Sequence, residues 1–253
     1  MNWPAEAIWE AVAPGLPGFT VEILPEIDSS NSELMRRARA GRSEPVLLVA
    51  ERQTAGRGRL GRGWASSAGE SLTFSLGLPL APADWSGLSL AVGVSVAESL
   101  HPAIRLKWPN DLWVQDRKLG GILIETASFG EAAGARYAVI GVGINIAARP
   151  AEGLSTPPAA LRELLPGSDA PETLLRLAPS LVRDIQGFEQ AGFRAFQLRF
   201  EARDALRDRA VTLSDGTAGT AHGVSEAGSL LVHTAAGLQV VSSSEVSVRP
   251  AAP

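Results

Sequence analysis

The sequence predicts an α+β protein in which a mixed or antiparallel sheet is packed with helices and is followed by a small all-β module. Three observations support this fold class. Apolar runs of strand length, such as residues 45–50 and 138–146, recur in the first part of the chain. Segments with apolar residues at helical spacing, such as 88–99, separate them. The last part of the chain has short apolar stretches divided by turn dipeptides such as Asp215-Gly216.

The size and charge of the chain fit a globular protein of one large and one small domain. We expect a main domain over residues 1–207 and a second domain over residues 208–253 of the 253-residue chain. A hydrophobic content of 45% and a charged content of 20% are ordinary for such a protein. Because 23 Lys and Arg face 27 Asp and Glu, the net charge is −4 and the surface as a whole is not built to hold DNA.

Several classes of protein are excluded by what the sequence lacks. The absence of cysteine excludes a disulfide framework, a thiolate zinc site and a cysteine nucleophile. The first residues do not form a basic segment followed by an apolar core, and no apolar run is long enough to span a bilayer. We therefore expect a cytoplasmic protein without a membrane anchor.

Two helices are predicted near the N-terminus. The first covers residues 5–12 and is stopped by Pro14-Gly15. The second begins at the Ser29-Ser30-Asn31 turn, because Ser30-x-x-Glu33 fits a capping box, and it continues to Gly41. The hydroxyls and free amides at this turn either only cap the helix or also bind a small polar group. The residues alone leave both interpretations open.

The segment from Glu51 to Trp64, here named the arginine loop, follows the apolar run 45–50. Its four glycines allow tight turns among four arginines, whose guanidinium groups suit carboxylate and phosphate. The segment therefore predicts an anion site on a loop that leaves a buried strand. The alternatives are a solvated surface loop or a disordered nucleic-acid-binding tail. Against a tail, the segment is short, lies between two strand candidates and ends in a tryptophan.

The elements after the arginine loop are predicted to be core. Residues 72–78 alternate apolar with polar or small side chains, as a half-buried strand does, and residues 88–99 form a helix packed on the sheet. The strand 104–108 ends at Pro109, because the residue before proline is held extended. Pro109-Asn110-Asp111 is by itself an ordinary turn.

A hairpin follows, with strands at residues 112–114 and 118–125 around Gln115-Asp116-Arg117. Gly120 and Gly121 mark either a close approach to the backbone or a bulge.

Glycines also interrupt the buried strand 138–146, whose strongly polar residue Asn145 needs a hydrogen-bond partner. Since Gly141-x-Gly143 precedes no helix, a Rossmann fingerprint is a poor interpretation.

The remainder of the main domain is predicted to be a cover for the sheet. Residues 149–171 are rich in proline, glycine and alanine and indicate a surface excursion with at most one short helix around 159–165. Amphipathic helices at 172–190 and 193–206 then cover one face of the sheet. From about Arg209 the chain is small and all-β.

Five motifs in one order resemble the biotin–protein ligases, also called biotin–[acetyl-CoA-carboxylase] ligases. They are Asp28-Ser29-Ser30-Asn31, the arginine loop, Lys107-Trp108-Pro109-Asn110-Asp111, residues 117–125 and Gly141-Val142-Gly143-Ile144-Asn145. The resemblance is strong from about Ile27 to Ile146 and weaker elsewhere. It implies a catalytic domain like that of biotin and lipoate ligases and class II aminoacyl-tRNA synthetases, followed by an SH3-like barrel. Some relatives carry an N-terminal DNA-binding winged helix; the segment before Asp28 is too short for one, so no repressor activity is expected.

The resemblance implies a reaction in two steps. Biotin carboxylate attacks the α-phosphate of ATP, which leaves biotinyl-5′-AMP and pyrophosphate, with Mg²⁺ neutralising the pyrophosphate. The amine of one lysine on a biotin carboxyl carrier domain, by default that of acetyl-CoA carboxylase, then displaces AMP. No enzyme nucleophile is needed, and none of His101, His222 and His233 is a good candidate base, because each lies among residues expected at the surface or in the barrel.

The resemblance also implies roles for residues at matching positions. Those with an implied catalytic role are Arg57, Arg59, Lys107, Asp111 and Lys118. Those implied to bind biotin are Ser29, Ser30, Asn31, Gln53, Gly56, Arg57, Gly58, Arg59, Lys118 and Gly121. Those implied to bind ATP or the adenylate are Arg59, Arg62, Trp64, Lys107, Asn110 and Asn145. Metal ligands cannot be named from spacing. The arginine loop is expected to be mobile when empty and to order on ligand binding.

Two rival functions are considered. A lipoate–protein ligase would run the same adenylation on another acid, and the arginine loop joined to Lys107-Trp108-Pro109-Asn110-Asp111 distinguishes the biotin branch. A non-enzymatic nucleic-acid-binding module is disfavoured by the net charge and by the lack of interleaved aromatic residues. The sequence leaves open whether the protein is a monomer or a homodimer.

Overall fold

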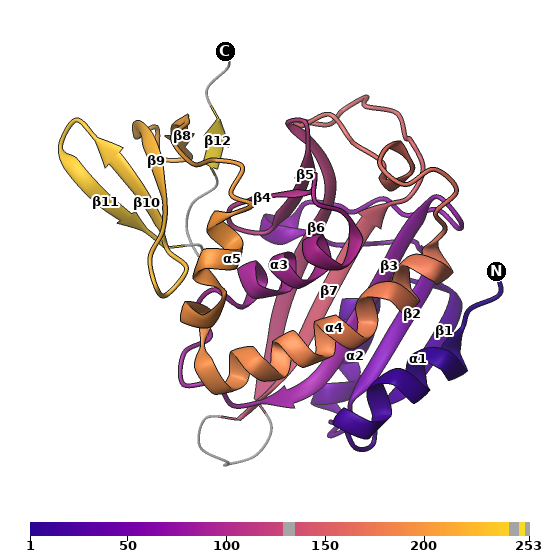
Figure 1. The fold of residues 1–253 in the computed structure, drawn as a ribbon. Helices are drawn as coiled ribbons and strands as arrows, with labels where there is room; N and C mark the ends of the chain where they lie inside the picture. The colour runs from indigo at the N-terminus through magenta and orange to yellow at the C-terminus, as the bar shows by residue number, and fades with distance from the viewer. Residues whose placement is uncertain (129–134, 243–247, 251–253) are drawn as a thin grey trace.

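The computed structural model describes residues 1–128, 135–242 and 248–250. Its larger part is a seven-stranded sheet with the order β1-β2-β3-β7-β6-β5-β4 (Figure 1). The strands are β1 (Thr20–Ile27), β2 (Val46–Gln53), β3 (Ser71–Leu80), β4 (Arg105–Lys107), β5 (Asp111–Val114), β6 (Arg117–Ser128) and β7 (Arg136–Asn145). β1 and β2 run parallel, and the other neighbouring strands are antiparallel. The predicted mixed sheet packed with helices is therefore confirmed.

Helices cover the two faces of this sheet unequally. The helices α1 (Ala5–Val12), α3 (Leu88–Leu100) and α4 (Ala170–Ala191) lie on one face, where they bury the larger core (Figure 1). On β3 that face carries Phe74 and Leu76, whereas Thr73 and Ser75 point to the opposite face because side chains alternate along a strand. The opposite face is covered by α2 (Ser30–Arg39) over a smaller core. Much of that face is therefore left for a cavity.

Three of the predicted helices have the expected position. The helix at residues 5–12 has the predicted bounds, and the helices predicted at 88–99 and 172–190 extend over Leu88–Leu100 and Ala170–Ala191. Asp169 caps the last of these, because its side chain accepts the backbone N–H of Glu172. Strong helical periodicity thus located these elements without tertiary information.

The strand β1 was not predicted. Among the described strands it is an edge strand that pairs with β2 alone, and most of its residues are only partly buried. Its alternation of apolar residues is weak, and Pro25 lies inside it. Proline is tolerated in edge strands, where an N–H is not needed on the open side.

The helix predicted at residues 193–206 was too long. The structure has a 3-10 turn at Phe193–Phe196 and a short α5 at Gln197–Glu201. The chain then leaves the helix because its backbone pairs with β4: the N–H of Leu106 donates to Arg203 O, and the N–H of Ala205 donates to Leu106 O. Backbone pairing with a distant strand overrides the helical pattern of these residues.

The C-terminal part forms a second, five-stranded sheet with the order β11-β10-β9-β8-β12, as expected for an SH3-like module. Its strands are β8 (Ala210–Leu213), β9 (Ala218–Val224), β10 (Leu230–Thr234), β11 (Gly237–Val241) and β12 (Val248–Pro250). The buried indole N–H of Trp108 donates to Gly228 O at 3.0 Å and joins this sheet to the main domain. The predicted boundary after residue 207 precedes β8 and stays a prediction.

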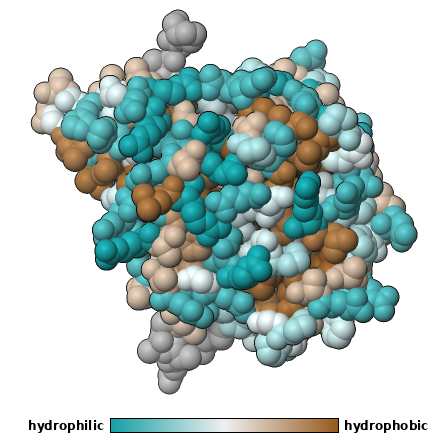
Figure 2. All heavy atoms as spheres, in the orientation of Figure 1, coloured by the Kyte–Doolittle hydropathy of each residue, from teal (hydrophilic) through white to brown (hydrophobic). Residues whose placement is uncertain are grey.

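The surface of the small sheet carries an apolar strip. Leu238 and Val240 of β11 are 53% and 66% exposed. Figure 2 shows brown spheres where Figure 1 places this strand. Among the residues that the structure describes, no helix combines the length and the apolar character needed to cross a membrane.

Candidate active site

A cavity lies on the open face of the sheet beside α2, and residues far apart in the sequence line it. The loops and strands that contribute are the arginine loop, β3, β6, β7 and the segment after β7. Most of the predicted site residues lie in this lining. They are Ser29, Ser30, Asn31, Gln53, Arg57, Gly58, Arg59, Arg62, Trp64, Asn110, Asp111, Lys118, Gly121 and Asn145.

One end of the cavity, here named the neutral end, is built from uncharged hydrogen-bonding groups. Gln53 Oε1 accepts the backbone N–H of Ser30 at 2.7 Å and its hydroxyl at 3.0 Å. The Ser75 hydroxyl lies 2.7 Å from Ser30 Oγ and 2.6 Å from Asn31 Oδ1 and can donate to one of them at a time. Ser30, Asn31 and Ser75 are all buried, so this end is fixed in place before any ligand arrives.

The cap of α2 differs from the prediction. Ser29, not Ser30, is the N-cap residue, and its side chain accepts the N–H of Ser32. Ser30 is the first helical residue, so its hydroxyl is available to Gln53. Ser29 therefore caps the helix, and both serines line the cavity; that the turn binds a small polar group stays a prediction.

The arginine loop closes on itself over the cavity. Its base is fixed because the N–H of Trp64 donates to Gly56 O at 2.8 Å, and a Cβ added at Gly56 would overlap the Trp64 carbonyl. Near its tip, the N–H of Gly58 donates to Arg62 O at 2.7 Å. The Trp64 indole packs on Gly143, where a Cβ would overlap the ring, and the Arg149 guanidinium lies 5.4 Å from the ring centroid. Sequence reasoning missed Arg149, which lies in the supposed surface excursion.

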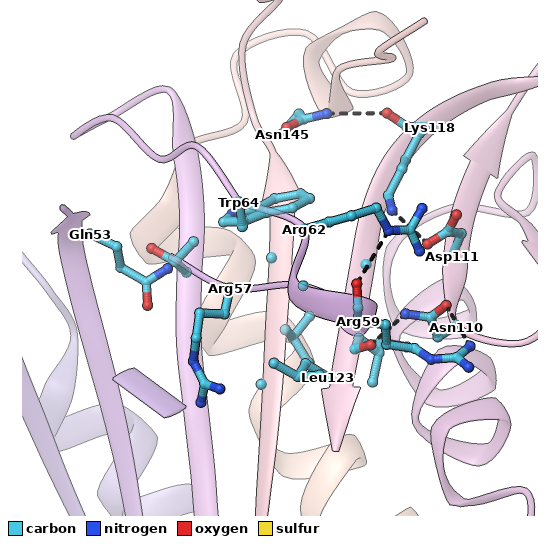
Figure 3. Close-up of a pocket in the computed structure, with 18 of the residues that line it drawn as sticks. Gln53, Arg57, Arg59, Arg62, Trp64, Asn110, Asp111, Lys118, Leu123 and Asn145 are labelled. Carbon is cyan, nitrogen blue, oxygen red and sulfur yellow. Dashed lines mark hydrogen bonds and ion pairs between the residues drawn. The ribbon is translucent and has the colours of Figure 1, made fainter. Parts of the chain in front are cut away.

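The other end, here named the cationic end, gathers basic side chains. Lys118 Nζ lies 2.6 Å from Asp111 Oδ1, and Arg62 Nε donates to Arg59 O at 3.3 Å (Figure 3). Burial, with Arg62 adding repulsion, lowers the pKa of Arg59. Burial also lowers the pKa of Lys107; Asp111 opposes this effect, whereas the nearby cations add to it. An anion bound here would relieve this repulsion.

Asn110 and Asn145 fix the strands around the cationic end. The Asn110 amide donates to Ile122 O at 2.7 Å, and its Oδ1 lies 3.5 Å from Arg59 Nη1. The Asn145 amide donates to Lys118 O and Ala159 O at 3.1 and 3.0 Å. Among the described residues, the buried Asn145 Oδ1 has no hydrogen-bond partner. This oxygen is therefore suited to accept a hydrogen bond from a ligand.

The segment after β7 is part of the cavity wall and not a free surface excursion. The N–H of Lys118 donates to Pro157 O at 2.8 Å, and the N–H of Ala159 donates to Lys118 O at 2.9 Å. Leu154, Ser155 and Thr156 consequently line the cavity next to the cationic end. The composition of this segment did not indicate its position in the wall, because the segment is held there by backbone hydrogen bonds.

Three predicted site residues lie differently from the rest. Gly56 and Lys107 are not among the lining residues of this cavity; Gly56 supports the loop base, and Lys107 Nζ lies 5.3 Å from the Trp113 ring centroid. Arg57 lines the cavity, but its guanidinium points away from Arg62 and Lys118 (Figure 3). Its partner is Glu125 at 2.6 Å, a residue to which the sequence assigned no role.

Gly120 and Gly121 of β6 lack a side chain for two different structural reasons. A Cβ at Gly120 would overlap Gly143 O of β7, so this glycine is required by strand packing. At Gly121 the nearest atoms belong to Lys118 and Asp111, at 3.4 Å or more, so this glycine leaves open space beside the two charged groups. The register between β5 and β6 also shifts between Leu112 and Trp113, as at a bulge.

Comparisons with known proteins agree with this geometry. The model of the biotin/lipoate A/B protein ligase family matches residues 26–145, and that of the biotin protein ligase C terminal domain matches residues 209–249. The bifunctional ligase/repressor BirA of Escherichia coli is 37% identical over 93% of this chain and 76% of its own length. The biotin--[acetyl-CoA-carboxylase] ligase of Paracoccus denitrificans is 34% identical over 88% of this chain and 98% of its own.

A solved structure has the same architecture. The biotin protein ligase of Aquifex aeolicus in complex with biotin and ATP superposes with a TM-score of 0.76 and 32% identity. The match covers 91% of this chain and 99% of that one. Motifs, fold and relatives agree, and this chain belongs to the biotin protein ligase family.

Proposed function

We propose that this protein is a biotin–[acetyl-CoA-carboxylase] ligase, which forms biotinyl-5′-AMP from biotin and ATP and transfers the biotinyl group to a carrier lysine. The observation that carries the proposal is the division of one cavity into a neutral and a cationic end. A biotin molecule has a neutral ureido ring at one end and a carboxylate at the other. A cavity of this kind orients the carboxylate toward the site of phosphate chemistry.

The neutral end would hold the ureido ring. Ser30 and Gln53 present hydroxyl and amide groups there, and the backbone of Gly58 lines the same cavity. The absence of side chains at Gly141 and Gly143 lets the Asn31 side chain and the Trp64 ring pack directly on β7 and form this part of the wall. The residues proposed to bind biotin are Ser29, Ser30, Asn31, Gln53, Gly56, Arg57, Gly58, Arg59, Lys118 and Gly121.

The cationic end would hold the reacting carboxylate and the nucleotide phosphates. The transition state of adenylation spreads negative charge over phosphoryl oxygens, and fixed cations stabilise it. Lys118 and Arg59 would contact the carboxylate and α-phosphate, and Arg62 the triphosphate. The adenylate group would extend toward Trp64 and Asn145; the Asn145 oxygen, which has no partner within the described part of the chain, can accept from an amino group. Asn110 and Lys107 complete the proposed nucleotide set.

Asp111 has a proposed role in the transfer step. It is the one carboxylate that lines the cavity within the described part of the chain, and it already contacts the Lys118 ammonium at 2.6 Å. A carboxylate in that position can orient an incoming lysine amine or accept its proton. The described residues hold no cluster of three metal-binding side chains. Mg²⁺, which prefers substrate phosphates and only one or two carboxylates, would suit this site with Asp111; it supplies charge neutralisation of pyrophosphate.

The test is pyrophosphate exchange into ATP, run with biotin, with lipoate and with no acid. We expect exchange that depends on biotin. Arg59→Ala should reduce it a hundredfold or more, since one charge-assisted contact contributes about 2–4 kcal/mol to such a transition state. Arg52→Ala is the control, because Arg52 lies at the end of β2, ahead of the glycines of the loop, and pairs with Glu26 at the surface. Exchange that depends on lipoate would identify a lipoate–protein ligase instead. If neither acid supports exchange, the proposed function is wrong.

The acceptor protein, the cellular compartment and the oligomeric state are also proposals. We expect a biotin carboxyl carrier domain as acceptor, action in the cytoplasm and no DNA binding, with a homodimer as an open possibility. Transfer of labelled biotin to a purified carrier domain, sedimentation of the protein and titration with duplex DNA test these points separately.

A further inference from the structure

Arg57 and Glu125 form an ion pair that joins the arginine loop to β6. Arg57 Nη2 lies 2.6 Å from Glu125 Oε2, across 68 positions of sequence. The two side chains are 43% and 24% exposed. The pair therefore lies at the margin of the cavity, where solvent weakens a purely Coulombic attraction.

The same carboxylate oxygen has a second, buried partner. The Asn31 amide donates to Glu125 Oε2 at 2.9 Å and to Leu123 O at 3.2 Å. Asn31 is only 4% exposed, and a Cβ at Gly141 would overlap its side chain, so its position is determined by packing. Glu125 thus accepts hydrogen bonds from a fixed group of α2 and from a group of the arginine loop at the same oxygen.

A continuous hydrogen-bonded path then runs from the arginine loop to the neutral end. From Asn31 it continues through Ser75 to Ser30, which is held by Gln53. We name Arg57, Glu125 and Asn31 the clasp. Asn31 cannot shift without disturbing this path. The clasp therefore couples the position of the arginine loop over the cavity to the positions of the groups at the neutral end.

The direction of Arg57 also separates it from the cationic end. Its guanidinium points away from Arg62 and Lys118 (Figure 3), and Glu125 neutralises it. The next residue, Gly58, lines the cavity and is held by its hydrogen bond to Arg62 O. The pairing with Glu125 at the margin of the cavity therefore directs the Arg57 charge away from the cationic end.

We propose that Glu125 is a positioning residue of this ligase, which holds the arginine loop closed through Arg57 and thereby retains biotin and biotinyl-5′-AMP. The proposal rests on the proposed function. It adds a role for Glu125, which is not among the residues proposed above to bind biotin or ATP. Loss of Glu125 loosens the loop at the neutral end but leaves the cations that stabilise the adenylation transition state. The expected defect is a faster escape of ligand with little change in chemistry.

The test is a double-mutant cycle with Arg57→Ala, Glu125→Ala and the double variant. Each single variant should raise KM for biotin and the rate of biotinyl-5′-AMP release about tenfold, a modest value because the pair is partly exposed. In Glu125→Ala, the kcat of biotin-dependent exchange and KM for ATP should stay within about twofold. The double variant should be no worse than the worse single one, because both remove one clasp.

Two further variants keep the test sharp. Glu125→Gln retains an acceptor for the Asn31 amide but loses the charge that holds Arg57, so its defect should be intermediate. Arg52→Ala, which removes the exposed pair with Glu26 at 2.8 Å, should leave biotin release unchanged. Melting temperatures identify any variant that has lost its fold, and such a variant is excluded from the cycle.

Two outcomes would overturn the clasp. If Arg57→Ala lowers kcat a hundredfold while Glu125→Ala has no effect, Arg57 acts directly on the reacting groups. If the two defects add in the double variant, they have separate causes. Either result leaves the proposed function standing, because biotin-dependent exchange by the unsubstituted protein is measured independently.

Discussion

The two ends of the cavity differ in how they are stabilised before a ligand binds. At the neutral end, Gln53 accepts hydrogen bonds from Ser30, and the buried Ser75 hydroxyl lies within hydrogen-bond distance of both Ser30 and Asn31. At the cationic end, Arg59, Arg62, Lys107 and Lys118 share one lining carboxylate within the described residues, and burial lowers the pKa of two of them.

This difference indicates two modes of ligand binding. The neutral end is preorganised, so a small polar ring gains hydrogen bonds without displacing the protein groups. The cationic end holds unfavourable energy that an anionic substrate, and still more an anionic transition state, relieves. We therefore expect that substitutions can separate recognition of the acid at the neutral end from catalysis at its carboxylate at the cationic end.

The largest expected effect is at the cationic end. Lys118→Ala removes the cation that contacts Asp111, and biotin-dependent pyrophosphate exchange should fall a hundredfold or more, or about 2.7–4 kcal/mol. The matched control is Arg117→Ala, one residue earlier, whose side chain pairs with Glu163 at the surface. Loss of exchange in both variants would indicate a damaged hairpin, and the effect could then not be attributed to the Lys118 charge at the cationic end.

A smaller effect is expected at the neutral end. Gly141→Ala places a Cβ against the Asn31 side chain, so KM for biotin should rise about tenfold or more while KM for ATP changes little. Gly187→Ala in α4 is the control, since no atom lies within 4 Å of an added Cβ there. Equal changes in the two KM values would show that the ends are not independent.

The smallest effect is a difference in salt dependence. Between about 0.05 M and about 0.5 M KCl, affinity for ATP should fall several-fold, because the Debye length shrinks and the cationic end is partly open to solvent. Binding of biotinol, a neutral analogue with an alcohol in place of the carboxylate, should be nearly insensitive to salt. Inhibition and titration calorimetry measure how the affinities for ATP and biotinol depend on salt. The same dependence for both ligands would argue against a difference between the two ends.

Local patterns predicted most of the fold because local physics determines those elements. The helix at residues 5–12 and the long helix after Asp169 follow from periodicity, capping and breaker residues. The β5–β6 hairpin follows from two apolar runs around a polar turn. The edge strand β1 and the shortened α5 did not follow, because one depends on pairing with β2 and the other on pairing with β4.

The candidate site divides in the same way. The motifs alone identified the chemical inventory, since glycines among arginines, a Lys–Trp–Pro–Asn–Asp turn and a lone strand asparagine stand out in any context. They could not indicate that residues 154–156 join the wall, because hydrogen bonds between Lys118, Pro157 and Ala159 bring them there.

The sequence by itself determined the family, the fold class and which charged and polar groups are available. Only the tertiary structure decided how those groups are used: Arg59 lines the cationic end, whereas Arg57, two residues earlier, turns to Glu125. The physical reason is that the direction of a side chain on a glycine-rich loop has no local determinant. A partner 68 positions away fixes it, and folding alone brings the two together.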